Sequence, residues 1–180
     1  MPFSSPDIET LKIDLDNNIV AVQKLKADSH ATIKIQSLLN ITIYVLATRL
    51  LEGAVKHIIY NCCIMRGDTA IQLKVIESEL KKFNNPEFSR MKELFSKHLL
   101  FDISDGLKGN WFNTRDVSFL DEIVKNRHRN VHASHDSSNW YNNNLKDLID
   151  FGKEYNGMLN ILCYLDLIKW DGVNNKFDVI

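Results

Sequence analysis

Apolar residues recur at intervals of three and four along most of the chain, the spacing that places them on one face of an α-helix. A first helix is expected from about Asp7, a plausible N-cap. A second is expected to begin between residues 31 and 36 and to end near Cys63. Its apolar face is wide, which predicts a central helix covered on several sides.

Three charged positions interrupt the apolar character of this second helix. They are Arg49, Glu52 and Lys56. Glu52 and Lys56 are four residues apart, so the simplest interpretation is a solvated strip in which these two side chains form an ion pair.

Breaking residues divide the middle of the chain into shorter helices. Arg66-Gly67-Asp68 is expected to be a turn in which Gly67 closes one helix and Asp68 caps the next. The third helix would span about 69–83, where Asn84-Asn85-Pro86 breaks it, and the fourth about 87–98.

Residues 99–116 lack a helical period but retain apolar side chains, which predicts an ordered loop packed on the body of the protein. Thr114 or Asp116 would cap the helix that follows from about Val117. A polar loop is expected over 134–144 and a long final helix over about 145–169.

The resulting fold prediction is all-α: one helical domain over 1–180, with about six helices and a long ordered loop before the fifth long helix. Residues 1–6 are expected to be a loose terminus. The short tail over 170–180 is expected to form a turn or an edge strand.

Composition fits a protein of the cytoplasm. The net charge of -1 gives no global basic field, so any nucleic acid would have to bind a local patch. Cys62, Cys63 and Cys163 have no CxxC spacing and predict buried free thiols in a reducing compartment. No secretory leader or apolar run of transmembrane length is evident, so no membrane partner is expected.

One segment concentrates candidate chemistry: residues 127–135 hold three histidines and two arginines. Leu120, Val124, Arg127 and Val131 are spaced four, three and four, which places Arg127 on an apolar seam. A buried arginine is costly unless it is paired. It could form a salt bridge, for example with Glu52, or be held rigidly to bind a phosphate.

The histidines allow two further interpretations. His128 and His132 have the spacing of a two-histidine metal site, which His135 or Asp136 could complete, but no HExxH motif or second ligand cluster is present, so no metal or other cofactor is expected. Arg127 and His132 would lie about 140° apart on an ideal helix. They converge only if the helix ends or bends there, or if a second copy of the chain supplies the other half.

Arg127-His128-x-x-x-His132 forms an R-polar-x-x-x-H pattern after the apolar run 119–124. It resembles the motif of the HEPN superfamily (higher eukaryotes and prokaryotes nucleotide-binding) of the ribonuclease type, as in RiboL-PSP-type domains. The run 51–56 is also similar to the early long helix of that family, with Glu52 as its acidic residue. His128 replaces the commoner asparagine. Ser134 stands where partners of nucleotidyltransferase antitoxins carry tyrosine, which argues against that subgroup.

The resemblance implies a metal-independent endoribonuclease that cleaves RNA as a homodimer with a composite active site. Arg127 would bind the scissile phosphate, and His132 would transfer protons. His128 would be a further catalytic residue that orients the phosphate or His132. Glu52 and Asn130 would support the site, and RNA-binding roles are expected for Lys125, Arg129 and His135.

Such a protein would be a toxin or antiviral defence effector, with an antitoxin or a larger defence complex as a further partner. The alternative is a non-catalytic HEPN-like module that binds nucleotide, RNA or a protein. A third interpretation is a structural subunit in which Arg127 forms a buried salt bridge.

Overall fold

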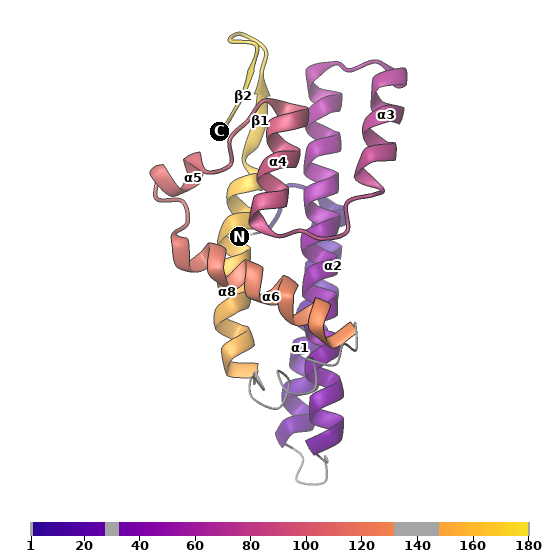
Figure 1. Ribbon diagram of the computed structural model, residues 1–180, viewed down its shortest axis with the longest axis vertical. Helices are drawn as coiled ribbons and strands as arrows, with labels where there is room; N and C mark the ends of the chain where they lie inside the picture. Colours follow the sequence, from indigo (N-terminus) through magenta and orange to yellow (C-terminus); the bar gives the residue numbers. More distant parts are fainter. Residues whose placement is uncertain (1, 28–32, 132–147, 180) are drawn as a thin grey trace.

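The computed structural model is predominantly helical (Figure 1). It describes residues 2–27, 33–131 and 148–179, with side chains described over 2–25, 41–127 and 150–179. The elements in these residues are α1 (Pro6–Ala27), α2 (Ile33–Arg66), α3 (Ala70–Leu80), α4 (Phe88–Leu99), α5 (Asp105–Lys108), α6 (Thr114–Val131), α8 (Leu148–Asp166), β1 (Ile168–Asp171) and β2 (Lys176–Val179). The expected all-α class is confirmed.

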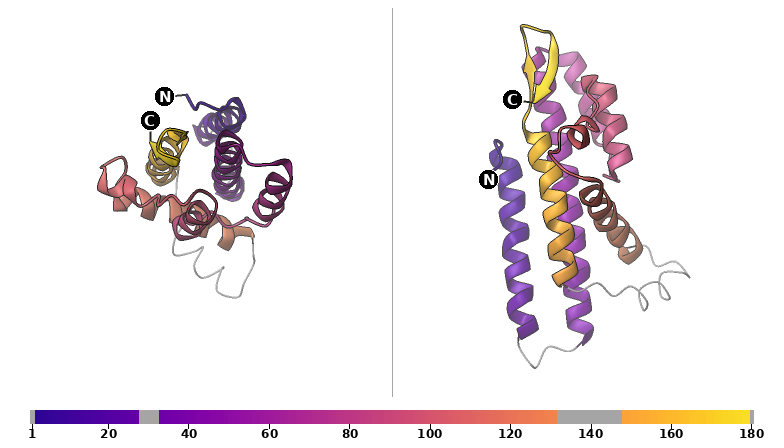
Figure 2. Two further views of the ribbon diagram at one scale, coloured as in Figure 1. Left: turned by 90° about the horizontal axis from the view of Figure 1, so that it is seen from above. Right: turned by 90° about the vertical axis from the view of Figure 1, so that its left-hand side faces the viewer.

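The central helix is α2, as its wide apolar face predicted. It runs the length of the molecule, with α1 and α8 alongside it (Figure 2). Helix α6 crosses obliquely and packs on both α8 and α2, while α3 and α4 cover the other end of α2 (Figure 1). The buried apolar side chains form one cluster to which all these helices contribute. Burial of this surface is the main force that holds the helices together.

The expected ion pair on α2 is present. Lys56 Nζ lies 2.5 Å from Glu52 Oε1, and both side chains are partly exposed. The next position, Gly53, faces α1, where an added Cβ would lie 2.8 Å from Leu11 Cδ1. A glycine here lets α1 and α2 approach closely.

The turn after α2 has a different cap from the one expected. Gly67 adopts a left-handed φ of 87° and closes the helix, as predicted. However, Thr69 caps α3, in a reciprocal capping box with Gln72. Asp68 instead pairs with Arg66 at 2.5 Å. Asp68 and the adjacent Thr69 are both residue types that favour the N-cap position, so residue type alone does not distinguish them.

The N-terminal segment is not loose, contrary to expectation. The Phe3 side chain is buried, and Ser4 donates to the Asp166 carboxylate from its backbone N–H at 2.6 Å and from its hydroxyl at 2.7 Å. Helix α1 begins at Pro6, so Asp7 lies in its first turn and does not cap it. Ser4 and Asp166 are 162 residues apart, so no local sequence pattern predicts their contact.

The C-terminal tail forms a strand pair. Helix α8 ends at Asp166, and β1 pairs antiparallel with β2, with Trp170 opposite Phe177. The expected loop over 99–116 is ordered and buries Ile103 and Phe112, but it contains the short helix α5 and leaves Trp111 half exposed. Cys62 and Cys63 are buried free thiols, as expected, whereas Cys163 is partly exposed.

Candidate functional site

Helix α6 carries the candidate motif, and its N-terminus is fixed by a different cap from the two predicted. Asn113 Oδ1 accepts hydrogen bonds from the N–H groups of Arg115 (2.8 Å) and Asp116 (3.1 Å). Asp116 returns a bond by accepting from the Asn113 N–H at 3.0 Å. The N-cap is therefore Asn113, neither Thr114 nor Asp116, although Asp116 completes the capping box.

A glycine on α8 lets α6 pack closely against it. A Cβ added to Gly157 would lie 2.9 Å from Phe119 Cδ2 and 3.1 Å from Asp116 Cα. The helices are therefore held together near the start of α6. This contact and the cap give the motif helix a defined position on the bundle.

The buried seam of α6 follows the sequence pattern as far as its last turns. Leu120, Ile123 and Val124 are fully buried. The next buried side chain is Asn126, which is 2% exposed, and its Nδ2 has no hydrogen-bond partner among the described residues. A buried amide without a partner is uncommon and is a reason to examine its surroundings for function.

Arg127 does not form the salt bridge considered from the sequence. It is partly exposed, and its Nη1 donates to the backbone carbonyl of Asn84, in the α3–α4 loop, at 3.4 Å. No ion pair joins Arg127 to Glu52 in the described part of the chain, where Glu52 is paired with Lys56. At this distance the bond to Asn84 is weak, and it is the one hydrogen bond of the guanidinium to described residues.

The α3–α4 loop is held beside α6 by a partly buried carboxylate. Asp121 Oδ1 accepts a hydrogen bond of 2.8 Å from the backbone N–H of Phe88, the first residue of α4. This replaces a side-chain cap, which Glu87 does not provide. Burial raises the pKa of Asp121, and the bond from Phe88 opposes that shift.

A second polar contact lies between α2 and α8. The Tyr44 hydroxyl donates to Glu154 Oε2 at 2.9 Å, and both side chains are buried. Burial and the negative charge of Glu154 raise the pKa of Tyr44, with smaller effects of Asp150 and Glu122. Glu154 is not among the site residues predicted from the sequence. Its position three residues after Phe151 and four before Met158, on the buried face of α8, was the available signal.

Of the other predicted site residues on the motif segment, the structure describes only one side chain, that of Lys125. Lys125 is exposed on α6. The backbone of His128, Arg129 and Asn130 lies within α6, and their side chains are outside the described residues, as are His132 and His135 entirely. The two-histidine metal interpretation falls on these residues. Among the side chains that the structure describes, no cluster of His, Cys, Asp and Glu could bind a metal.

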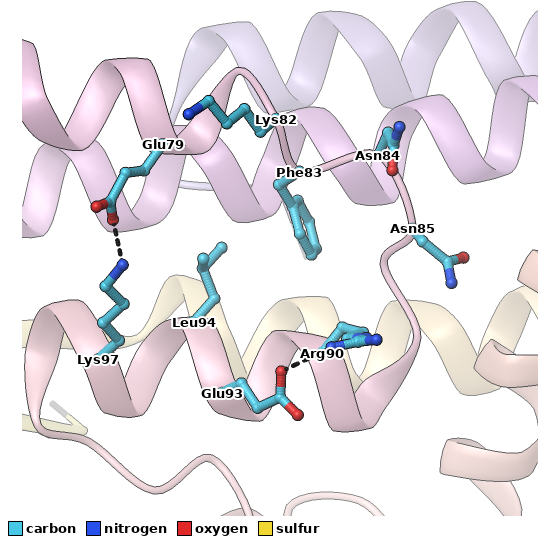
Figure 3. Close-up of a pocket in the computed structure, with 9 residues that line it drawn as sticks. All are labelled: Glu79, Lys82, Phe83, Asn84, Asn85, Arg90, Glu93, Leu94 and Lys97. Atoms are coloured by element: carbon cyan, nitrogen blue, oxygen red, sulfur yellow. Dashed lines mark hydrogen bonds and ion pairs between the residues drawn. The ribbon is translucent and has the colours of Figure 1, made fainter.

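A groove opens next to Arg127, between α3 and α4, with a volume of about 600 Å³ (Figure 3). Asn84 and Asn85 lie at one end of it, and Phe83 and Leu94 line its middle. Because the Asn84 carbonyl is also the acceptor for Arg127, the groove and the motif helix share one residue.

Comparison of the chain with models of protein families, with curated proteins and with solved structures gives no match. Within the described ranges, no helix combines the length and apolar character that crossing a membrane requires.

Proposed function

We propose that this protein is a metal-independent endoribonuclease of the HEPN type. The observation that carries the proposal is the environment of Arg127. It lies in the last turns of α6 on the apolar seam of the sequence, yet its guanidinium is partly exposed, without an ion pair among the described residues, and weakly hydrogen-bonded. An arginine of this kind is suited to bind a phosphate through several N–H donors at once.

The reaction needs few protein groups, because RNA carries its own nucleophile. The 2′-oxygen attacks the adjacent phosphorus while a base takes the 2′-OH proton. The bond from phosphorus to O5′ then breaks, and an acid protonates O5′. The products are a 2′,3′-cyclic phosphate and a 5′-OH. No metal is required, and no other co-reactant enters.

In this mechanism Arg127 binds the scissile phosphate and stabilises the charge that develops on it. His132 transfers a proton, since an imidazole with a pKa near 6.5 can act as acid or base at neutral pH. His128 and Asn130 orient the phosphate or His132, and Lys125, Arg129 and His135 bind neighbouring phosphates.

A homodimer provides the second proton-transfer group. On an ideal helix Arg127 and His132 point about 140° apart, so one copy of the motif does not bring both groups to one phosphate. Two motifs facing one cleft supply two histidines, one acting as base and one as acid. Glu52 has a smaller role than the sequence suggested, because Lys56 neutralises it within the same helix.

The test is RNA cleavage with EDTA present, by wild-type protein and by Arg127→Ala and His132→Ala variants. Each substitution should lower the rate by about 10²- to 10⁴-fold, the usual contribution of a proton-transfer or charge-stabilising group. Arg115→Ala is the matched control, because Arg115 is at the opposite end of α6 and is exposed over the Phe119 ring. Wild-type rates in both motif variants, or loss of activity caused by EDTA alone, would contradict the proposal.

The structure also bears on the interpretation of the chain as a merely structural subunit. That interpretation needs Arg127 in a buried salt bridge, and the partner considered for it, Glu52, is paired elsewhere. A non-catalytic binding module remains the competing function. It would bind RNA between pH 6 and 8 without cleaving it, and the same assay separates the two.

A further inference from the structure

We propose that the groove between α3 and α4 binds one unpaired nucleotide of the RNA, next to the phosphate held by Arg127. Its base would lie in the groove and its phosphate on Lys82. This assigns a substrate-selecting site to residues outside the motif, and it rests on the proposed ribonuclease function.

The lining of the groove suits a nucleobase. Figure 3 shows Phe83 and Leu94 directed into the space between the two helices, with the Asn84 and Asn85 side chains at one end. Its volume of about 600 Å³ lies within the usual range of small-molecule sites, about 300–1,000 Å³. Apolar side chains can cover the faces of a base, and amide groups offer both donors and acceptors to its edge.

The charges in the groove leave one cation available for a phosphate. At the far end Lys97 pairs with Glu79 at 2.6 Å, and along α4 Arg90 pairs with Glu93 at 3.1 Å (Figure 3). Lys82 also lines the groove, is exposed, and has no ion-pair partner among the described residues. Two neutralised pairs and one remaining cation fit a single phosphate better than the backbone of a long duplex.

The position of the groove connects it to the reaction. The Asn84 backbone carbonyl accepts the hydrogen bond from Arg127, so the amide end of the groove adjoins the phosphate-binding group. The bond from Phe88 to Asp121 holds this loop against α6. A base in the groove and a phosphate on Arg127 are therefore parts of one continuous surface.

Single-stranded RNA is favoured over an acidic peptide by the same lining. Acidic side chains could pair with Lys82, but they would leave the apolar floor and the two amides unused. Sequence-specific RNA recognition uses unstacked bases on apolar or aromatic side chains, with hydrogen bonds to the base edges.

The experiment measures binding of a non-cleavable, 2′-O-methylated single-stranded RNA, so it does not depend on catalysis. Lys82→Ala should weaken binding and reduce the slope of log Kd against log salt by about 0.7, the value for one phosphate contact on a single strand. Lys74→Ala is the matched control, since Lys74 is exposed on α3, the helix that ends just before Lys82, but does not line the groove. Equal slopes for Lys82→Ala and Lys74→Ala would overturn the proposal.

A second variant tests the base. Asn84→Ala combined with Asn85→Ala removes both amides and keeps the backbone carbonyl that Arg127 uses. With RNAs that differ at one position, this variant should lose the preference among bases that the wild type shows next to the bound phosphate. An unchanged base preference would refute the site. So would displacement of the RNA by an acidic peptide, if Lys82→Ala also leaves RNA binding unchanged. If these effects appear but the wild type cleaves no RNA, the groove stands and the proposed catalysis fails.

Discussion

At the scale of single residues, Arg127 is more exposed than its place on the apolar seam of α6 predicted. The spacing from Leu120 and Val124 placed it in the core, but the structure leaves it partly exposed and buries Asn126 beside it. A long side chain near the end of a helix can extend past the packed interface, which avoids the penalty of burying its charge. This keeps the guanidinium available for a ligand.

The buried bond from Tyr44 to Glu154 gives a prediction about stability. Tyr44→Phe removes a hydrogen bond to a carboxylate, which should lower the free energy of unfolding by about 2 kcal/mol. Tyr60→Phe on the same helix is the control, because the Tyr60 hydroxyl has no hydrogen bond to described residues, and its effect should stay within about 0.5 kcal/mol. Urea unfolding of the three proteins measures the difference. Equal losses would contradict a stabilising role for the Tyr44 bond.

At the scale of elements, α6 is held at its start and in its middle by different contacts. The Asn113 cap and the approach to Gly157 fix its start, and Asp121 ties its middle to the first turn of α4. The α3–α4 loop is thereby brought to Arg127. The packing of α6 thus positions both the motif and the groove beside it.

Asp121 is therefore expected to stabilise the junction of α4 and α6. Asp121→Ala should lower the free energy of unfolding by about 1 kcal/mol, as for loss of a helix cap, whereas Asp121→Asn keeps an oxygen acceptor for the Phe88 N–H. Thermal or urea unfolding of both variants checks this order. A larger loss in the asparagine variant would show that the charge, and not the acceptor, matters.

The raised pKa of Asp121 predicts how the stability difference between these variants and the wild type changes with pH. Because burial raises the folded-state pKa of Asp121, the folded protein binds the proton more tightly than the unfolded chain does. This group therefore favours folding most at low pH, and the contribution declines as pH rises from the unfolded pKa through the folded one. The stability of Asp121→Asn relative to wild type should increase as pH rises above the pKa of an unfolded-state aspartate, about 4. A constant difference would contradict the shift.

The helices were predictable because each has a continuous apolar face, and the turn at Gly67 was predictable because its left-handed φ favours glycine. The caps were harder, since Asp68 and Thr69, or Asn113 and Thr114, are equally suitable by type. The contact of Ser4 with Asp166 and that of Arg127 with Asn84 join distant parts of the chain. No local pattern encodes such pairs, so the groove beside the motif was not foreseen.

At the scale of the whole molecule, the candidate chemistry is a local feature of a nearly neutral protein. The net charge is -1, so the proposed attraction of RNA would depend on the few cations around the end of α6 and the groove. Helices α1 and α8 lie alongside α2, and the crossing helix α6 and the shorter α3–α4 pair carry the proposed site (Figure 1). The proposed phosphate-binding arginine and the proposed base-binding groove therefore lie on one face of the bundle.

The most direct test of the central claim is the chemistry of the RNA ends. Pure protein should cleave a labelled single-stranded RNA in EDTA and leave a 2′,3′-cyclic phosphate on one fragment and a 5′-OH on the other. A substrate with 2′-deoxy at the cleaved position should stay intact there, because the nucleophile is missing. RNA that stays intact with folded protein, or cleavage that requires a metal and leaves 5′-phosphate ends, would contradict the account.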